Sequence, residues 1–331
     1  MTPADLRERL SRVPTIPFAP DATPVEELPR LSAVLGGGPH LFVKRDDAMT
    51  FGFGGNKVRK LAFVVARALA EGADTLITAG GVQSNHARAT AAAAAKLGLR
   101  AVIVASGVAQ EKPTANALLD ALLGAEVLYV GQREERTARM HEVAARLRGE
   151  GRTPFEIPIG ASTPLGALGY VNAMVELIDQ MPAPDVIVHS TSSGGTQAGL
   201  VAACRLLGLS TRIVGISADD PAAAIQSQVR TIVGGIGELL ESDDGERLGQ
   251  LLSRGTAIEI DDRFVGEGYG IPTAASQEAI RLAARTEALF LDPTYTGKAM
   301  AALVAYVRQQ RLKAGQTVLF WHTGGQVGLF A

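Results

Sequence analysis

The sequence predicts an α/β protein built on mainly parallel β-sheets. Short apolar runs rich in β-branched residues alternate along the chain with amphipathic stretches of helical length, a pattern typical of strands joined by crossover helices. Several runs end in clusters drawn from the 37 glycines, as expected where strand ends bring the backbone close to a ligand. No fixed repeat and no Pro- or Ser-rich linker divides the chain, which favours domains whose chain segments cross.

Helix and strand signals follow one another regularly in the first half. Apolar residues at helical spacing begin at Asn56, a candidate N-cap, and stop at Gly72. An alanine-rich stretch from Ser84 to Gly98 predicts a closely packed, buried helix. The expected elements are helices over 56–72, 84–96, 115–123 and 141–148, and strands over 75–78, 101–104 and 127–130.

The second half repeats this alternation, so both halves predict parallel α/β sheets. The expected elements are helices over 165–181, 196–207, 273–287 and 296–311, and strands over 186–188, 212–216 and 317–321.

Length and composition exclude several classes of protein. The 331 residues suggest two domains or one large one, long enough to fold without disulfides or a structural metal. Lys+Arg 32 against Asp+Glu 34 gives a net charge of -2, which argues against a nucleic-acid partner. No stretch resembles a signal peptide or membrane helix. The single Cys204 and the scattered histidines predict no disulfide and no metal site. We expect a soluble, cytoplasmic protein.

A glycine pair opens the helix that carries the first candidate motif, GGNKVRK at 54–60. The positive field at a helix N-terminus disfavours the charged form of Lys57, as an amine needs in order to form a Schiff base near neutral pH. Lys60 follows one turn later. A solvated lysine at a helix start is the simpler alternative for this segment taken alone.

Two further motifs lie where a predicted strand passes into a helix. In AGGVQSNH at 79–86, backbone N–H groups can hold a carboxylate while Ser84, Asn85 and His86 add oriented hydrogen bonds, although a polar N-cap also explains the pattern. STSSGGTQAG at 190–199 has small residues that leave the amides bare, which suits a phosphate monoester better than a packing turn alone. Neither motif is a Walker A loop or GxGxxG, so a nicotinamide-dependent dehydrogenase is disfavoured.

Two tyrosines next to glycine turns are the remaining candidates near the C-terminus. Tyr269 stands in GYG, and Tyr295 precedes a predicted helix in DPTYTGK at 292–298. A final strand ends in WHTGG at 321–325, which includes Thr323. Buried tyrosines often serve only packing, with a satisfied hydroxyl, but these two are retained as site residues.

Six motifs occur in the order found in one group of enzymes. They are KRDD at 44–47, GGNKVRKL at 54–61, QSNH at 83–86, GGTQAG at 194–199, GYG at 268–270 and HTGG at 322–325. On these motifs, from about Leu31 to the end, the chain resembles the fold-type-II pyridoxal-phosphate (PLP) enzymes related to the tryptophan synthase β-subunit. Within them it is most similar to the D-cysteine desulfhydrase and aminocyclopropane-carboxylate deaminase group.

This resemblance implies two domains, each an open, mainly parallel twisted sheet with helices on both faces. Segments 1–53 and 169–331 would form a larger PLP-binding domain, and 54–168 an inserted smaller one, with pyridoxal 5'-phosphate between them. Homodimers are common in the group, and we expect one here.

The resemblance also implies a role for each motif. Lys57 would form the Schiff base with PLP. The implied catalytic residues are Lys57, Ser84, Tyr269 and Tyr295. The implied cofactor-binding residues are Lys57, Lys60, Asn85, Ser193, Gly194, Gly195, Thr196 and Thr323. The implied substrate-binding residues are Ser84, Asn85, His86, Tyr295 and Thr296.

Two positions favour one reaction within the group. The ring-opening deaminases resemble one another in having Gln after Ser-Asn and Glu after the active-site tyrosine, whereas this chain has His86 and Thr296. Both match the desulfhydrase pattern, so α,β-elimination from the small amino acid D-cysteine, giving pyruvate, sulfide and ammonia, is the expected activity. L-cysteate sulfo-lyase, aminocyclopropane-carboxylate deaminase and a PLP-binding protein without turnover remain alternatives.

Overall fold

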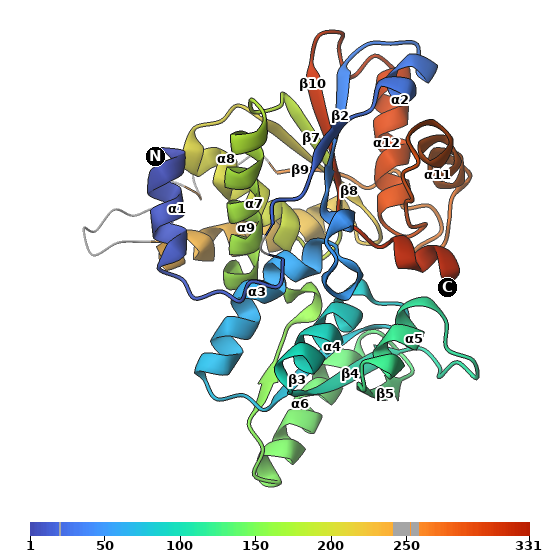
Figure 1. The fold of residues 1–331 in the computed structure, drawn as a ribbon. Helices are drawn as coiled ribbons and strands as arrows, with labels where there is room; N and C mark the ends of the chain where they lie inside the picture. The colour runs from blue at the N-terminus through green and yellow to red at the C-terminus, as the bar shows by residue number, and fades with distance from the viewer. Residues whose placement is uncertain (20, 241–251, 253–257) are drawn as a thin grey trace.

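The computed structural model describes residues 1–19, 21–240, 252 and 258–331. Strands and helices alternate as the sequence predicts, and the strands form two separate sheets, one above the other in Figure 1. Within these described ranges, no helix is both long and apolar enough to cross a bilayer.

The larger sheet has six strands in the order β1-β2-β10-β7-β8-β9. Only the edge strand β1 is antiparallel to its neighbour, and the other four pairings are parallel. Its strands are β1 (Val25–Glu27), β2 (His40–Arg45), β7 (Val186–Thr191), β8 (Arg212–Ser217), β9 (Glu259–Asp261) and β10 (Thr317–His322). Strands from both sides of the segment 46–185 therefore meet in one sheet.

The smaller sheet is entirely parallel and has the order β5-β4-β3-β6. Its strands are β3 (Thr75–Gly81), β4 (Arg100–Ser106), β5 (Glu126–Val130) and β6 (Pro154–Glu156). All four lie within the segment 54–168. The division of the chain into two domains remains a prediction.

Helices cover both faces of the larger sheet (Figure 1). One face packs against α1 (Pro3–Ser11), α7 (Pro164–Gln180), α8 (Gly195–Leu207) and α9 (Ala222–Leu240). The other packs against α2 (Pro29–Val34), α11 (Ala274–Glu287) and α12 (Thr296–Arg308). Each side forms its own hydrophobic core, as expected for a parallel sheet buried on both faces.

The smaller sheet is covered in the same way. On one face lie α3 (Asn56–Ala70) and α4 (Asn85–Leu97), and on the other α6 (Glu135–Gly149). The short α5 (Ala115–Leu122) packs beside α4. All the alanines of α4 except Ala95 are buried, which confirms the closely packed helix predicted from the sequence.

Most predicted elements are present with shifted ends, and several elements were not predicted. The expected N-cap Asn56 is the first residue of α3, and Gly55 occupies the cap position. The sequence did not predict strand β2 because its apolar run is short and is followed by two charged residues, Lys44 and Arg45. Of these, Lys44 is fully buried, where Glu176 and Gln180 accept hydrogen bonds from it. The other elements without a prediction are α1, α2, α9, β1, β6 and β9.

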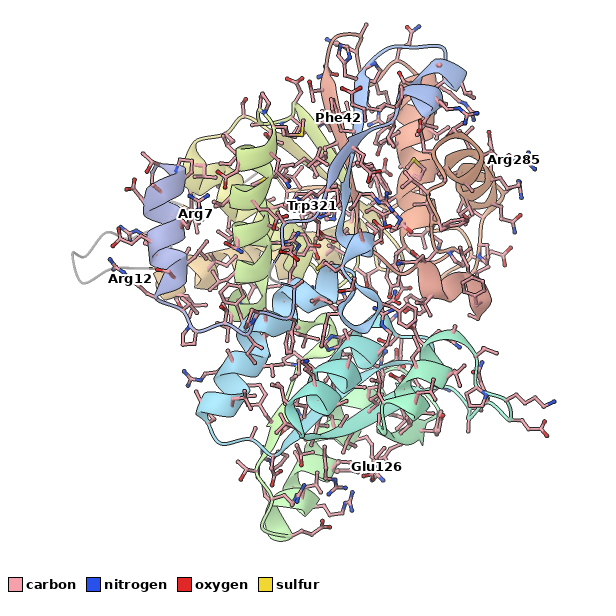
Figure 2. All side chains as sticks on the ribbon, in the orientation of Figure 1. Arg7, Arg12, Phe42, Glu126, Arg285 and Trp321 are labelled. Carbon is pink, nitrogen blue, oxygen red and sulfur yellow. The ribbon has the colours of Figure 1, made fainter. Side chains whose placement is uncertain are left out.

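A buried cluster around Asp46 joins α3, α7 and the larger sheet. Its carboxylate accepts hydrogen bonds from Arg59 Nη2 (2.8 Å), Trp321 Nε1 (2.8 Å) and the Tyr170 hydroxyl. In Figure 2, Trp321 lies in the interior, whereas Arg7, Arg12 and Arg285 lie at the periphery. The charge of Asp46 is thus compensated inside the protein, as a buried carboxylate requires.

Two glycines bring α3, α7 and α8 into backbone contact. A Cβ added to Gly169 of α7 would lie 2.3 Å from the carbonyl oxygen of Arg59 in α3. A Cβ added to Gly199 of α8 would lie 2.4 Å from the carbonyl oxygen of Ala167 in α7. We call these three helices the glycine-packed stack. This stack fixes α3 relative to the N-terminus of α8. Lys57 is the second residue of α3, so the stack also fixes the position of Lys57.

Candidate active site

A cavity of about 440 Å³ lies between the carboxyl ends of the strands of the two sheets. Ligands of open α/β sheets bind at this edge because the loops there leave space between the strands and the following helices. The cavity is lined by nearly all the predicted site residues: Lys57, Lys60, Ser84, Asn85, His86, Ser193, Gly194, Gly195, Thr196, Tyr269, Tyr295 and Thr323. Thr296 is the exception.

Two lysines lie side by side in the cavity, both on the first turns of α3. Burial lowers the pKa of Lys57 to about 8. Burial and neighbouring Lys57 lower the pKa of Lys60, whose Nζ donates a hydrogen bond to Ser162 Oγ at 3.2 Å. In the described part of the chain, neither lysine forms an ion pair. The pair therefore combines a readily neutralised amine with a strong preference for an anion.

The N-terminus of α8 faces these lysines with bare backbone. Gly194 adopts the left-handed conformation (φ +79°) as its N-cap and supplies no capping side chain. A Cβ at Gly195 would lie 2.7 Å from Ser162 Oγ and 3.1 Å from Lys60 Nζ. Glycine thus leaves open a space bounded by an ammonium group, hydroxyl groups and helix N–H groups. Helix N-termini of this kind bind phosphate.

The loop after β3 orients two polar side chains toward the cavity. Ser84 caps α4, and its Oγ accepts a hydrogen bond from Ala87 N at 3.2 Å, so its hydroxyl proton remains free to donate. Asn85 Oδ1 accepts from Asn116 Nδ2 at 2.9 Å. Because that oxygen is occupied, the amide group of Asn85 is the end available as a donor to a ligand.

His86 is held as a neutral ring. The Thr78 hydroxyl lies 2.8 Å from His86 Nε2 and donates to the carbonyl oxygen of Ile157 at 2.9 Å. Nε2 must then carry the proton and donate to Thr78. Burial and the nearby lysines hold the pKa of His86 well below its usual range, so Nδ1 is an unprotonated acceptor. This atom has no partner among the described residues.

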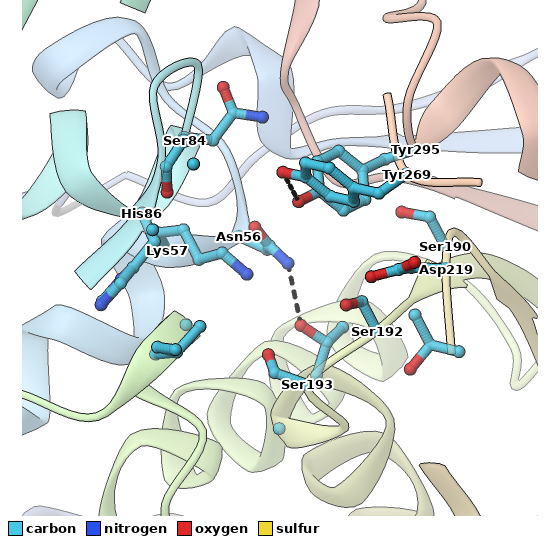
Figure 3. Close-up of a pocket in the computed structure, with 18 of the residues that line it drawn as sticks. Asn56, Lys57, Ser84, His86, Ser190, Ser192, Ser193, Asp219, Tyr269 and Tyr295 are labelled. Atoms are coloured by element: carbon cyan, nitrogen blue, oxygen red, sulfur yellow. Dashed lines mark hydrogen bonds between the residues drawn. The ribbon is translucent and has the colours of Figure 1, made fainter. Parts of the chain in front are cut away.

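Tyr269 and Tyr295 form a pair that lies to the upper right of Lys57 in Figure 3. Their hydroxyl oxygens are 2.7 Å apart, and their rings meet edge to face at 5.8 Å. One hydroxyl donates to the other, which leaves one of the two protons free. Burial raises the pKa of Tyr295 well above its usual value, so this hydroxyl stays protonated at neutral pH.

Thr296 follows Tyr295 but points away from the cavity. It is fully buried, and its hydroxyl donates to Asp292 Oδ1 at 2.7 Å. The other oxygen, Asp292 Oδ2, accepts from Tyr295 N at 2.8 Å. The structure thus assigns Thr296 a place in the start of α12, where it helps to anchor the backbone of Tyr295, and not the substrate contact that the resemblance implies.

Thr323 closes the cavity at the end of β10. Its hydroxyl lies 2.9 Å from Ser190 Oγ at the end of β7, and its carbonyl oxygen accepts from Asn56 N at 3.0 Å. The second contact ties the start of the lysine helix to the larger sheet. Figure 3 shows a second tie, in which Asn56 Nδ2 donates to Thr196 Oγ1 at 3.0 Å.

Several cavity residues were not predicted from the sequence. Ser162 lies just outside the cavity lining, where it contacts Lys60 from the loop before α7, and no local signal marks it. Arg133, Arg136 and Asp219 follow the carboxyl ends of β5 and β8. Their place after strands was a usable signal, but the sequence does not show which strand ends of the two sheets face each other.

This set of donors suits a phosphate ester that also carries an aldehyde. The open space beside Gly195 and Lys60 matches a phosphate group, and Lys57 supplies an amine that is partly neutral near pH 8. The amide of Asn85 and the hydroxyl of Thr323 add neutral hydrogen-bonding groups at other points of the cavity. These residues fit PLP.

Comparisons with known proteins agree with this fit. The family model described as pyridoxal-phosphate dependent enzyme matches residues 16–324. The chain is similar to the crystal structure of an ACC deaminase homologue, with 36% sequence identity and a TM-score of 0.89 over 98% of this chain and 96% of that one.

More distant structures share the fold. A threonine deaminase from T.th. has 24% identity and a TM-score of 0.65, over 98% of both chains. Maize serine racemase has 18% identity and a TM-score of 0.66, over 98% of this chain and 93% of that one. The chain therefore belongs to the fold-type-II PLP-dependent enzymes and, within them, to the family of the aminocyclopropane-carboxylate deaminases and D-cysteine desulfhydrases.

Proposed function

We propose that this enzyme catalyses α,β-elimination from an amino acid with a sulfur substituent on Cβ, with D-cysteine as the first candidate. D-cysteine and water would give pyruvate, hydrogen sulfide and ammonia. The observation that carries the proposal is that one cavity is lined by Lys57, by the glycine N-terminus of α8 and by the paired hydroxyl groups of Tyr269 and Tyr295. Burial lowers the pKa of Lys57 to about 8. This combination offers a base, a cofactor site and an acid in one place.

PLP would be held by residues from both sheets. We infer that Lys60 and the loop Ser193–Thr196 bind its phosphate, Asn85 its phenolic oxygen and Thr323 its pyridine nitrogen. When bound, the cofactor forms a covalent bond to the substrate amine and delocalises the electron pair left at Cα. A threonine hydroxyl carries no negative charge, so it favours a neutral pyridine ring, which withdraws electrons less strongly than a pyridinium.

Lys57 would take the proton from Cα. A pKa of about 8 leaves a useful fraction of the amine neutral at physiological pH, and a base works best when its pKa lies near the working pH. Burial favours the neutral form of Lys57, and the hydrogen bond with Lys60 opposes it only in part. A bound phosphate would favour the charged form of Lys60, so the two lysines would divide the tasks of anion binding and proton transfer.

Ser84 and the first turn of α4 would bind the substrate carboxylate. The Ser84 hydroxyl has a free proton because its oxygen already accepts from Ala87 N. The helix N-terminus adds a favourable field for a carboxylate. The neutral ring of His86 supplies an acceptor on the same loop and adds no second positive charge there.

Tyr269 and Tyr295 would act at the leaving group. Only one proton is used between their hydroxyl groups, so the other can be donated to departing sulfur. We therefore assign the general acid to the tyrosine pair, in which Tyr295 is anchored through Asp292.

The placement of positions 86 and 296 supports elimination over opening of a cyclopropane ring. Ring opening demands additional acid–base or nucleophilic help. Thr296 gives none, because its hydroxyl is buried against Asp292. Aminocyclopropane-carboxylate deaminase is therefore the weaker candidate. L-cysteate sulfo-lyase, which would release sulfite by the same elimination, is favoured as a second candidate by a cation on the cavity wall, Arg136.

A panel of substrates tests this proposal. The purified enzyme is incubated separately with D-cysteine, L-cysteine, L-cysteate and aminocyclopropane-carboxylate, and pyruvate, 2-oxobutyrate, sulfide and sulfite are assayed. We expect pyruvate with sulfide from D-cysteine, and no turnover in Lys57→Ala. Product only from the cyclopropane, or turnover of Lys57→Ala near the wild-type rate, would contradict the proposal. A bound cofactor without any turnover would favour the non-catalytic alternative.

The proposal also includes the setting of the enzyme. We propose a cytoplasmic homodimer with a small amino acid as its substrate, built from a domain of residues 1–53 and 169–331 and an inserted domain of residues 54–168. The larger sheet takes its strands from residues 25–45 and 186–322, which supports this division.

A further inference from the structure

The loop before α6 and the first turn of that helix place two arginines, Arg133 and Arg136, on the cavity wall with different surroundings. Arg133 lies opposite the end of β8, where its guanidinium forms ion pairs with Asp219 at 2.7 Å and Asp220 at 3.4 Å. This ion pair connects the smaller sheet with the larger one across the cavity. Its charge is compensated by protein carboxylates, so Arg133 does not require a ligand.

Arg136 also lines the cavity but has no such compensation. Its Nε donates to the carbonyl oxygen of Arg133 at 2.8 Å, which fixes the side chain along the first turn of α6. Across the described ranges, its terminal nitrogens have no hydrogen-bond partner and its charge no ion-pair partner. Burial and Arg133 both lower its pKa. An uncompensated, half-buried guanidinium is costly and suits an anionic ligand.

Neither of the two anionic groups already assigned explains Arg136. In the proposed function, Lys60 and the N-terminus of α8 bind the cofactor phosphate. Ser84 and the N-terminus of α4 bind the substrate carboxylate. Arg136 comes from a different connection, between β5 and α6. Tyr269 and Tyr295 lie near enough to act on the pKa of Arg136, so the guanidinium lies on the side of the proposed leaving group.

We propose that Arg136 stabilises the negative charge on the departing sulfur group of the substrate. This inference rests on the proposed elimination. After the Cα proton passes to Lys57, the Cα electron pair forms the Cα=Cβ double bond while the Cβ–S bond breaks. The electron pair of that bond leaves with sulfur, as hydrosulfide from cysteine, which then takes up the tyrosine proton, or as sulfite from cysteate. The three-carbon enamine takes up water and yields pyruvate and ammonia.

The two sulfur substrates would use Arg136 at different stages. A sulfonate is already anionic in the bound substrate, so its attraction to the guanidinium contributes to binding and appears in KM. A thiol acquires its charge only as the bond breaks, so the same contact contributes to kcat. Chloride is the anion of a strong acid and leaves from β-chloroalanine with little assistance.

The test compares Arg136→Gln with wild type on D-cysteine, L-cysteate and β-chloroalanine of both configurations. Arg139→Gln is the matched control, because Arg139 is exposed on the same helix and paired with Glu142. Arg136→Lys keeps the charge. We expect kcat/KM of Arg136→Gln to fall by about 10- to 100-fold on the preferred sulfur substrate, the usual effect of one hydrogen bond to a charged group. β-Chloroalanine should lose much less, and Arg136→Lys should recover part of the loss.

Binding provides a second readout. L-cysteate binding is followed by its effect on the cofactor absorbance. If the sulfonate is the ligand of Arg136, L-cysteate should bind more weakly to Arg136→Gln than to wild type. If the departing thiol is the ligand, L-cysteate binding should be unchanged and kcat on D-cysteine should fall. The visible spectrum and the Tm without substrate should match wild type in both cases. An equal loss on all three substrates, or no loss on any, would overturn the role of Arg136. Absence of sulfide and sulfite from the wild-type enzyme would instead refute the proposed elimination, and this proposal with it.

Discussion

Replacing Gly195 with alanine should weaken cofactor binding without unfolding the protein. The new Cβ would lie 2.7 Å from Ser162 Oγ and 3.1 Å from Lys60 Nζ. The first distance is shorter than side chains tolerate, and Ser162 Cα would lie at 2.9 Å, so both the side chain and the backbone of Ser162 must shift. The Cβ would also occupy space proposed for the phosphate. A hydrogen bond to a charged group contributes about 1.5–3 kcal/mol. Losing one should therefore raise the cofactor Kd by about 10- to 100-fold.

The measurement is a titration of the cofactor-free protein with PLP, followed by visible absorbance. Gly149→Ala is the matched control, since Gly149 ends α6 and its new Cβ would meet no atom within 4 Å. Thermal unfolding of both cofactor-free variants separates binding from stability, because overpacking costs only about 1–3 kcal/mol. A Gly195→Ala protein that binds PLP as tightly as wild type would refute the assignment of this space to the phosphate.

Three other perturbations have equally specific outcomes. The rate of PLP uptake by cofactor-free protein should rise with pH and level off above about 8, since the neutral Lys57 amine reacts and burial lowers its pKa to about 8. Asp46→Asn should reduce the free energy of unfolding in urea by about 1.5–3 kcal/mol, because it removes the charged acceptor of buried Arg59, which then keeps only Glu176 as an ion-pair partner. Tyr295→Phe should lower kcat on D-cysteine by about 100-fold or more, the usual contribution of a general acid, with an unchanged cofactor spectrum.

Each of these has a control and a contradictory result. For the pH profile, Lys57→Met should show no uptake step. In wild type, the free energy of unfolding should rise with pH between about pH 8 and the ordinary pKa of lysine, because Lys57 in the unfolded chain binds more protons there than in the folded one. The Lys57→Met variant should lack this rise. Asp179→Asn, at an exposed ion pair, should cost at most about 1 kcal/mol, and an equal cost at Asp46 would contradict the role of the buried cluster. Tyr129→Phe on β5 should leave kcat unchanged, and an equally active Tyr295→Phe would remove the tyrosine pair as the acid.

Elements with local end signals were predictable from the sequence. The helix after Ser84 begins with that residue as its cap and ends at Gly98 in the left-handed conformation, and both signals are visible in neighbouring residues. Strand β2 was not predictable in this way. Its Lys44 is buried only because Glu176 and Gln180, more than a hundred residues away, accept its hydrogen bonds.

The same distinction holds for the candidate site. Motifs that act through their own backbone, such as the loop before α8, are visible as runs of small residues. Thr296 was predicted as a substrate-binding residue because of its position in the motif. The motif does not show that the Thr296 hydroxyl donates a hydrogen bond to Asp292. Arg136 was not predicted because its significance depends on which partners Arg133 finds across the cavity.

The glycine-packed stack also bears on how such an enzyme could acquire a different substrate. Any side chain at Gly169 or Gly199 would force apart helices that now meet through their backbones, so these positions offer almost no route for gradual change. The wall formed by α6 and the tyrosine pair carries no such constraint, because its side chains reach the cavity from loops and helix ends. New specificities should therefore arise by substitution on this wall, while the framework that sets the distance between lysine and phosphate loop is inherited unchanged. Laboratory evolution of this enzyme toward another leaving group should accumulate its first mutations there.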